Sequence, residues 1–543
     1  MFRSLMSLNH RCCVMIREMT EKFWDVIIIG TGMGGGTVGR ALAERGLSVL
    51  FVEKGPTGYR REEGGLSKKI TDAHARQLRG CWPLPIEGQV NGSTSRFFGP
   101  LGSGVGGSSV FYAAALERPE PHDLDHSPER PHPTGGWPIS YRSFLPHLEA
   151  AEKMYEVCGE CDPLADVTAE CLRMPPPLEA ADRELADSMR AAGLHPYRLH
   201  AAVRYVPECQ ECFGRKCPRD CKMDSRSAGV EPALKNECAA LLERCEVLRL
   251  LGGPHHVDGV LVSCGSGTAE LRGKVVVLAA GAYNSPRLLF ASANEHWPAG
   301  CANSSGLVGR NLMFHLDERI AVWPSKRIHG DMNPSKAIAL RDFYYAERQR
   351  FGMIQSVGLR ASYGDIVSYL DTLLDRSPLR SAMFPRAIAR LVAAGAGQVL
   401  GNAGIFVGFL EDLPYAGNRI LPPQKDGIIR FEYTFSEELL ARRKRFRQLI
   451  RQAFRSHRHM LLSFGPVLNT GHPCGTLRMG HDPALSVVDA QCRAHGIANL
   501  FVADASVFPT SMGVNPSLTI AANALRIAAP IAEAVRIAAD EKA

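Results

Sequence analysis

Apolar and polar positions between residues 24 and 55 form blocks that predict a strand, a glycine turn, a helix and a second strand. The apolar run 26–29 is typical of a buried strand. Glycines follow it directly, and a mixed apolar and polar run leads into a second apolar run at 49–52. This order predicts the beginning of an α/β layer with a parallel sheet.

The turn in this unit predicts a dinucleotide site. Gly30 permits a tight turn after the strand, Gly32 lets backbone amides approach a pyrophosphate, and Gly35 allows close packing of helix on strand. The helix N-terminus then faces the phosphates. Glu53 ends the second strand, where a carboxylate can accept hydrogen bonds from ribose hydroxyls. A plain glycine-rich turn is the alternative, and the two flanking strands and the acid in register disfavour it.

Three later segments fit the same layer. A second glycine loop spans residues 99–112, and a strand at 274–278 runs into Ala280 and Gly281, after which Ser285 and Pro286 predict a helix start. A last strand at 500–502 with Asp504 precedes a helix predicted from residue 516 to about 529. Asn515 before Pro516 is typical of an N-cap. We therefore expect the first and last parts of the chain to share one sheet.

Two segments of different character separate these pieces. We assign 24–120, 206–320 and 466–543 to the dinucleotide-binding domain, 121–205 and 321–465 to an inserted α+β substrate cap, and 1–23 to an N-terminal extension. Turn residues separate strand-like runs between 406 and 435, which predicts antiparallel sheet. Residues 365–405 predict an apolar or amphipathic wall, although an amphipathic core helix explains them equally well.

The amino-acid composition limits the kinds of molecule that this protein is expected to bind. The 543 residues are 45% hydrophobic and 22% charged, as in a globular protein with two or three structural regions. The net charge of +7 arises from 63 basic and 56 acidic residues spread along the chain, which argues against nucleic acid. Basic residues crowd only at 441–460, which predicts a cationic helix. That helix is either a solvated face or a docking face for an acidic partner or a lipid surface.

The chain carries no recognised export or membrane signal. Its first twenty residues lack a long apolar core and a twin arginine, so we expect a cytoplasmic protein. We expect no membrane-spanning segment, because the nearest apolar stretch, 387–404, is interrupted by Arg390. Peripheral contact with a membrane stays open.

Most of the 16 cysteines are scattered, as expected of small buried residues. Four are clustered and separated by two, four and three residues: Cys209, Cys212, Cys217 and Cys221. Disulfides are the least favoured interpretation in a reducing cytoplasm. Four thiolates suit zinc, and an iron-sulfur cluster also fits.

Several motifs together resemble the glucose-methanol-choline family of flavin oxidoreductases, from about residue 24 to 538. They are 103–109 (SGVGGSS), 281–289 (GAYNSPRLL), 306–312 (GLVGRNL), 137–141 (WPISY), 471–480 (GHPCGTLRMG) and 513–520 (GVNPSLTI). The resemblance implies that the dinucleotide is FAD and that the fold is a glutathione-reductase-type FAD domain with a cap. The expected cofactor-binding residues are Gly30, Gly32, Gly35, Glu53, Gly104, Gly106, Gly107, Ser108, Ser109, Val247, Ala280, Gly281, Asp504, Asn515 and Pro516.

The resemblance also implies a reaction. His472 is the expected base, since an imidazole accepts a proton near neutral pH, and Asn515 is expected to hold the substrate oxygen. The implied activity is oxidation of the CH–OH group of a primary alcohol, sugar or sterol-like alcohol, with hydride transfer to flavin N5. Electrons would then pass to an acceptor other than NAD, such as a protein or a quinone.

Alternatives remain at this point. Some dehydrogenases of the family carry a three-iron cluster, and Cys212, Cys217 and Cys221 are similar to its ligands, which favours iron-sulfur slightly over zinc. A lyase of the same fold that cleaves a cyanohydrin, or a non-catalytic subunit that binds FAD, is the other functional interpretation.

Overall fold

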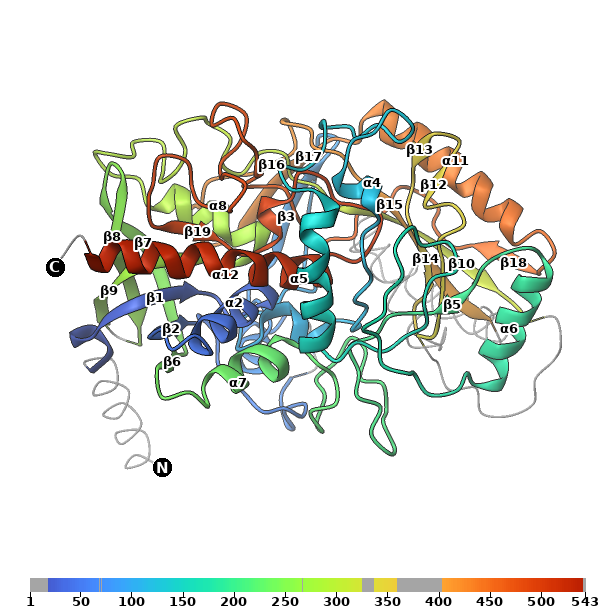
Figure 1. Cartoon of the computed structure of the whole chain (residues 1–543), viewed down its shortest axis with the longest axis horizontal. Helices are drawn as coiled ribbons and strands as arrows, with labels where there is room; N and C mark the ends of the chain where they lie inside the picture. The colour runs from blue at the N-terminus through green and yellow to red at the C-terminus, as the bar shows by residue number, and fades with distance from the viewer. Residues whose placement is uncertain are drawn as a thin grey trace.

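The computed structural model describes residues 18–67, 69, 71–265, 267–324, 336–358 and 403–540. Figure 1 shows a sheet crossed by the long helix α12 (Ser517–Asp540) at one end of the molecule, and a second sheet beside helix α11 (Glu437–Ala453) at the other. The proposed amphipathic wall at 365–405 lies almost wholly outside the described residues, as does most of the N-terminal extension. The described residues therefore include the sheet that carries the glycine turns and the core of the cap.

The first sheet joins the beginning, middle and end of the chain, as predicted. Strand β1 (Phe23–Ile29) lies between β2 (Val49–Val52) and β9 (Gly267–Leu278) in parallel register, with Ile28 opposite Phe51 and Val277. Strand β6 (Ala239–Leu242) extends the sheet beyond β2, and β19 (Leu500–Val502) pairs with β9. The antiparallel hairpin β7 (Cys245–Gly253) and β8 (His256–Cys264) completes it. The central strands are buried because helices cover the sheet.

Helix α2 (Met33–Ala43) packs closely on this sheet because its first turn is glycine-rich. A Cβ at Gly34 would lie 1.5 Å from the carbonyl oxygen of Ala503, beside the end of β19. Helix α12 then packs against both α2 and α5 (Tyr141–Met154). The last described helix is thus packed on α2, in the first unit of the α/β layer.

The second sheet is antiparallel and carries the order β18-β10-β15-β14-β11-β5. Its strands are His459–Leu461, His315–Val322, Gly404–Glu411, Ile354–Ser356, Ile338–Leu340 and Tyr197–Arg198 in that order. Phe446 of α11 stacks on Phe351 with ring centroids 5.7 Å apart, and α6 (Ala180–Ala191) joins the same apolar cluster. This sheet forms the core of the cap.

A four-stranded sheet joins cap and dinucleotide segments. Strand β17 (Ile429–Tyr433) pairs antiparallel with β16 (Arg419–Ile420) but parallel with β3 (Ile86–Val90), which in turn pairs with β4 (Ser93–Phe97). The antiparallel prediction for 406–435 therefore fails at the pairing of β17 with β3. Strand β10 similarly begins at residue 315, before the proposed cap boundary at 321. The division into domain ranges stays a prediction. The remaining elements are α3 (Ala73–Arg79), α4 (Pro121–Leu124), α7 (Glu231–Ala233), β12 (Tyr345–Ala346), β13 (Gln349–Arg350) and the short helical turns Gly107–Phe111, Arg226–Val230 and Ala505–Val507.

Two helix starts differ from the prediction. Helix α8 begins at Gly281, so Pro286 lies inside it rather than at its start. Because Pro286 has no N–H, the carbonyl of Ala282 loses its helical partner, and the Thr476 hydroxyl donates to that carbonyl instead at 2.8 Å. Helix α12 begins at Ser517 and continues to Asp540, well beyond residue 529.

The expectation that no segment is long and apolar enough to span a membrane is wrong for α12. This helix meets the length and hydropathy criteria, and it is the single helix among the described residues that does so. However, 56% of its most apolar window is buried within the protein, against α2 and α5. Helices in protein cores meet the same criteria.

The basic residues of α11 are largely paired within the chain. Glu318, which is fully buried, forms ion pairs with Arg443 and Arg447, and Arg445 pairs with Glu347. These partners reduce the cationic character that the sequence suggests for 441–460.

Candidate active site

A cavity of about 730 Å³ opens at the carboxyl ends of the parallel strands of the first sheet. Its walls come from the carboxyl ends of β1, β2 and β9, the first turns of α2 and α12, and residues 100–103 and 107–113. Ligands in open α/β sheets bind at this edge. The cavity reaches from the glycine turns to His472 and Asn515.

Most of the predicted site residues lie on this cavity. They are Gly30, Gly32, Glu53, Gly107, Ser108, Ser109, Val247, Ala280, Gly281, His472, Asp504, Asn515 and Pro516. Gly35, Gly104 and Gly106 are not among the lining residues. A Cβ on Gly35 would lie 2.0 Å from the Gly30 oxygen, and one on Gly104 2.8 Å from the Pro56 oxygen. These glycines therefore support the loops by close packing.

Glu53 links the two glycine loops. Its Oε2 accepts hydrogen bonds from the amide and the hydroxyl of Thr31, at 3.1 and 2.7 Å. The same Thr31 hydroxyl accepts from the amide of Gly106 at 3.1 Å. Burial raises the pKa of Glu53, while these hydrogen bonds oppose the rise. The expected contact between Glu53 and a ribose stays a prediction, and its link through Thr31 is an additional structural role.

Open backbone and helix N-termini in the cavity wall suit a dinucleotide. A Cβ at Gly32 or Gly281 would meet no atom within 4 Å, so both backbones face open space. Asp504 joins this wall to the last strand by accepting from the amide of Gly281 at 2.8 Å. The first turns of α2 and α12 both line the cavity, and helix N-termini favour anionic groups.

His472 is held by a second histidine that the sequence analysis did not single out. Nδ1 of His472 lies 2.9 Å from Nδ1 of His315, at the start of β10. Nε2 of His315 lies 2.9 Å from the carbonyl oxygen of Met512 and 3.2 Å from that of Ser511. Phe409 of β15 packs against both rings.

These contacts determine which nitrogen of His472 is basic. Carbonyl oxygens only accept, so Nε2 of His315 carries a proton. Burial lowers the pKa of His315, which keeps its ring neutral and leaves Nδ1 as an acceptor. Nδ1 of His472 must then donate. Burial, with His315 and Lys336, holds the pKa of His472 well below its usual value, so its Nε2 is the free base.

Asn515 has an unused polar atom at the cavity. It is buried, and its Oδ1 has no hydrogen-bond partner among the described residues. Because α12 begins at Ser517, Asn515 lies outside the N-cap position that the sequence predicts. Buried polar groups without partners are rare. The side chain is therefore available to a ligand in the cavity.

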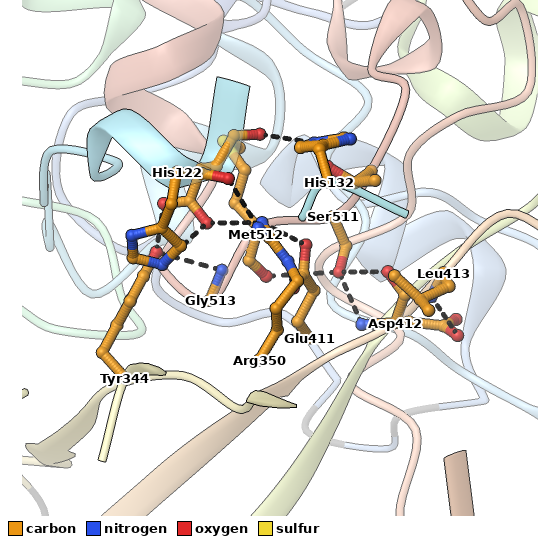
Figure 2. Close-up of polar contacts among 12 residues, drawn as sticks. His122, His132, Tyr344, Arg350, Glu411, Asp412, Leu413, Ser511, Met512 and Gly513 are labelled. Carbon is orange, nitrogen blue, oxygen red and sulfur yellow. Dashed lines mark hydrogen bonds and ion pairs between the residues drawn. The ribbon is translucent and has the colours of Figure 1, made fainter. Parts of the chain in front are cut away.

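The turn 511–513 supports both histidines and leads directly into Asn515. Figure 2 shows Ser511 bound to Asp412: the Asp412 amide donates to the Ser511 hydroxyl at 2.8 Å, and that hydroxyl donates to the Asp412 carbonyl at 3.1 Å. Met512 adopts a left-handed backbone with φ of 61°. Such a conformation persists when its surroundings fix it.

The other side of the turn rests on a buried ionic network (Figure 2). The Gly513 amide donates to the Tyr344 hydroxyl at 3.1 Å, and this hydroxyl donates to Asp123 at 2.6 Å. Arg350 donates to Asp123 at 3.0 Å and to Glu411 at 2.6 Å. All these side chains are at least nine-tenths buried. Loss of one partner would leave a buried charge or donor unpaired.

The four clustered cysteines lie apart from the lining of the cavity. The sulfur of Cys221 is 3.4 Å from that of Cys217 and 3.7 Å from that of Cys209. In the described part of the chain, no group of three or more His, Cys, Asp or Glu side chains is placed to hold a metal ion. The prediction of an iron-sulfur or zinc site is thus unsupported, because these thiols instead pack on one another as small, largely buried groups around Cys212. Elsewhere, Cys245 and Cys264 form a disulfide between β7 and β8, which the sequence analysis did not foresee.

Thr31 and His315 are the functional residues that the sequence analysis missed. Thr31 stands between Gly30 and Gly32, within the glycine turn itself. His315 follows the motif 306–312 by three positions, but its contact with His472 bridges 157 residues. No local pattern reveals that contact.

Two glycine substitutions separate folding from ligand binding. Gly34→Ala forces a methyl group onto the Ala503 carbonyl, so we expect it to lower stability by about 1–3 kcal/mol. Gly32→Ala places its methyl group in the cavity, so the apo protein should keep its stability while dinucleotide occupancy falls. Denaturant unfolding and absorbance of the bound cofactor measure the two effects. Equal stability of both apo variants would contradict this assignment.

Removal of one hydroxyl tests the support of the turn. Tyr344→Phe leaves the buried Gly513 amide without its acceptor, and we expect a loss of about 1–3 kcal/mol in the free energy of unfolding. Tyr345→Phe is the matched control, since its hydroxyl makes only an exposed contact with the Glu129 carbonyl. Chemical denaturation of both variants decides the matter, and equal effects would argue against the role of Tyr344.

Comparisons with known proteins agree with this geometry. The chain is 27% identical to paromamine 6'-oxidase of Streptomyces fradiae over 94% of its length and 92% of the relative. It is also 27% identical to 2-methyl-1,2-propanediol dehydrogenase of Mycolicibacterium austroafricanum, with 92% and 94% covered. In fold it is similar to pyridoxine 4-oxidase from Mesorbium loti, with a TM-score of 0.61, 19% identity and 93% and 99% of the two chains covered. A fungal aryl-alcohol oxidase gives a TM-score of 0.62, with 17% identity and 94% and 99% covered.

Family models support the same assignment over most of the chain. The N-terminal model of the GMC oxidoreductases matches residues 24–317, and the C-terminal model matches residues 423–524. The protein therefore belongs to the GMC (glucose-methanol-choline) oxidoreductase family of FAD-dependent enzymes.

Proposed function

We propose that this protein oxidises the CH–OH group of a small alcohol, with His472 as the base and FAD bound in the cavity. The observation that carries the proposal is the hydrogen bond between His472 and His315, which leaves Nε2 of His472 as a proton acceptor. Names of the relatives support the choice of substrate class, since they include an aryl-alcohol oxidase and a diol dehydrogenase.

His472 and Asn515 have separate roles in the proposed reaction. Nε2 of His472 takes the hydroxyl proton, because an alkoxide gives up hydride more readily than an alcohol does. Asn515 directs a buried amide group at the cavity and can hold the substrate oxygen. FAD, when bound, supplies the two-electron acceptor for that hydride. The proton on His472 stays stabilised, since Nδ1 continues to donate to His315.

Several groups of the chain would hold the cofactor in the cavity. Gly32, Gly107 and Gly281 offer close backbone approach, and the first turns of α2 and α12 face the same space. We further propose that electrons leave to an acceptor other than NAD, either dioxygen, a protein or a quinone. The cytoplasmic location stays a prediction.

Substitution of the base tests the reaction. We expect His472→Ala to lower kcat by about a hundred- to ten-thousandfold, while the flavin absorbance band is retained. His481→Ala is the control, because His481 is exposed and lies outside the lining of the cavity. The measurement is anaerobic bleaching of the flavin band by a panel of primary alcohols and sugars.

Three outcomes of this experiment discriminate between functions. Bleaching that depends on His472 supports an alcohol oxidoreductase. Turnover of a cyanohydrin without any bleaching would indicate a lyase instead. Full activity in His472→Ala would remove this residue from the mechanism.

The pH profile follows from the lowered pKa of His472. The base must be neutral in the free enzyme, and its pKa lies below 6.5, so kcat/KM for an uncharged alcohol should stay level from pH 6.5 upward and fall only at lower pH. His315→Phe removes the neighbour that helps to lower this pKa and the acceptor of the Nδ1 proton. We therefore expect the acid limb of this variant to move to higher pH, with a lower plateau. An unchanged profile in His315→Phe would contradict the tautomer assignment.

A further inference from the structure

Lys336 is a buried cation in the wall of the active-site cavity. It lies two residues before β11 (Ile338–Leu340), in the antiparallel sheet whose strand β10 carries His315. Only 4% of its surface is exposed, and it lines the same cavity as His472 and Asn515. It is close enough to His472 to lower the pKa of that histidine.

No hydrogen bond or ion pair joins the Lys336 ammonium to any residue in the described part of the chain. Two other buried cations of this protein, Lys222 and Arg341, each have several polar partners. Lys222 donates to the carbonyls of Val110, Cys212 and Arg215 at 2.8, 2.9 and 2.6 Å, and Arg341 binds Glu117 and Glu120 at 2.8 and 2.6 Å. An ammonium group buried without a partner is costly. Lys336 therefore lacks a counter-ion that its surroundings call for.

The described residues do not supply that counter-ion. Glu117 is the acid whose charge raises the pKa of Lys336. However, its Oε2 already accepts hydrogen bonds from Arg341 and from the Tyr197 hydroxyl, at 2.8 and 2.9 Å. His472 is the other titratable group whose pKa Lys336 affects, and it is neutral. The carboxylates on the cavity wall are Glu53, Glu246 and Asp504, which bind Thr31, Lys54 and Gly281. These three lie toward the dinucleotide end.

Burial lowers the pKa of Lys336 to about 7, and Glu117 opposes this shift only in part. The amine thus holds its proton weakly while the cavity contains no anion. An anionic ligand would restore the proton, because a charged partner favours the charged form.

We propose that Lys336 anchors the substrate, and that the alcohol oxidised here carries a carboxylate which pairs with this lysine. The proposal rests on the proposed function, since it concerns the same cavity. It excludes substrates that bring a cationic group to this position, because two cations would then share one buried wall. The hydroxyl of the substrate points to His472 and its carboxylate to Lys336.

Three alcohols of matched length test the proposal: 4-hydroxybutanoate, 1,4-butanediol and 4-aminobutan-1-ol. With an artificial electron acceptor at pH 7, we expect kcat/KM to be highest for the hydroxy acid and lowest for the amino alcohol. Lys336→Met should lower kcat/KM for the hydroxy acid, through KM, by about tenfold more than it lowers kcat/KM for the diol. Lys336→Arg should keep the preference, and the exposed Lys444→Met is the control.

A binding measurement separates this proposal from the proposed function. Butanoate should raise the Tm of the flavin-loaded protein and butylammonium should not, whether or not any of the three alcohols is oxidised. Because the carboxylate binds the protonated amine, its affinity should be constant below pH 7 and fall about tenfold per pH unit above it. In Lys336→Arg the affinity should not change with pH over this range.

Two results would overturn the proposal. One is a Tm shift by butylammonium that equals or exceeds the shift by butanoate. The other is an equal effect of Lys336→Met on all three alcohols. If flavin is bleached by alcohols while either result holds, alcohol oxidation stands and the role of Lys336 falls.

Discussion

The active site depends on the turn formed by residues 511–513. Neighbouring side chains hold this turn in place, and the turn in its turn positions the residues of the active site. The carbonyls of Ser511 and Met512 fix the proton on His315, and His315 fixes the proton on His472. The same turn leads into Asn515 at the cavity. Tyr344 and Asp412 hold the turn from opposite sides. A single backbone geometry therefore controls both the basicity of one side chain and the position of another.

This arrangement explains why so many charged groups are buried far from the flavin site. The ionic network lies outside the lining of the cavity, although it supports the turn. Asp123 accepts a hydrogen bond from the Tyr344 hydroxyl, which itself accepts one from the Gly513 amide. Arg350 binds both Asp123 and Glu411. Buried ion pairs add little net stability but penalise any rearrangement that separates the partners. Rigidity of the turn is the benefit, since proton transfer requires the reacting atoms to be held within hydrogen-bond reach.

The parts of the structure that local pattern encodes were predicted well. The glycine turns, the apolar strands and the link of the last strand to the first sheet follow from periodicity and from residues within one short window. Contacts created by sheet pairing were missed. His315 and Phe409 meet because β10 pairs with β15, nearly a hundred residues later in the sequence, and nothing near either residue records the pairing. The local patterns that misled were Pro286, which lies inside helix α8, Asn515, which lies before the first turn of α12, and the cysteine spacing, which resembles a ligand set but packs as thiols.

The placement of α12 has a consequence for how the enzyme is made. Strand β19 completes the sheet that β1 begins, and α12 covers α2 while its first turn closes the cavity. A ribosome therefore releases the glycine turn at residues 30–35 long before the wall at 504–520 has been synthesised. The nascent polypeptide cannot enclose its flavin during most of elongation, so acquisition of the cofactor waits until translation is almost finished.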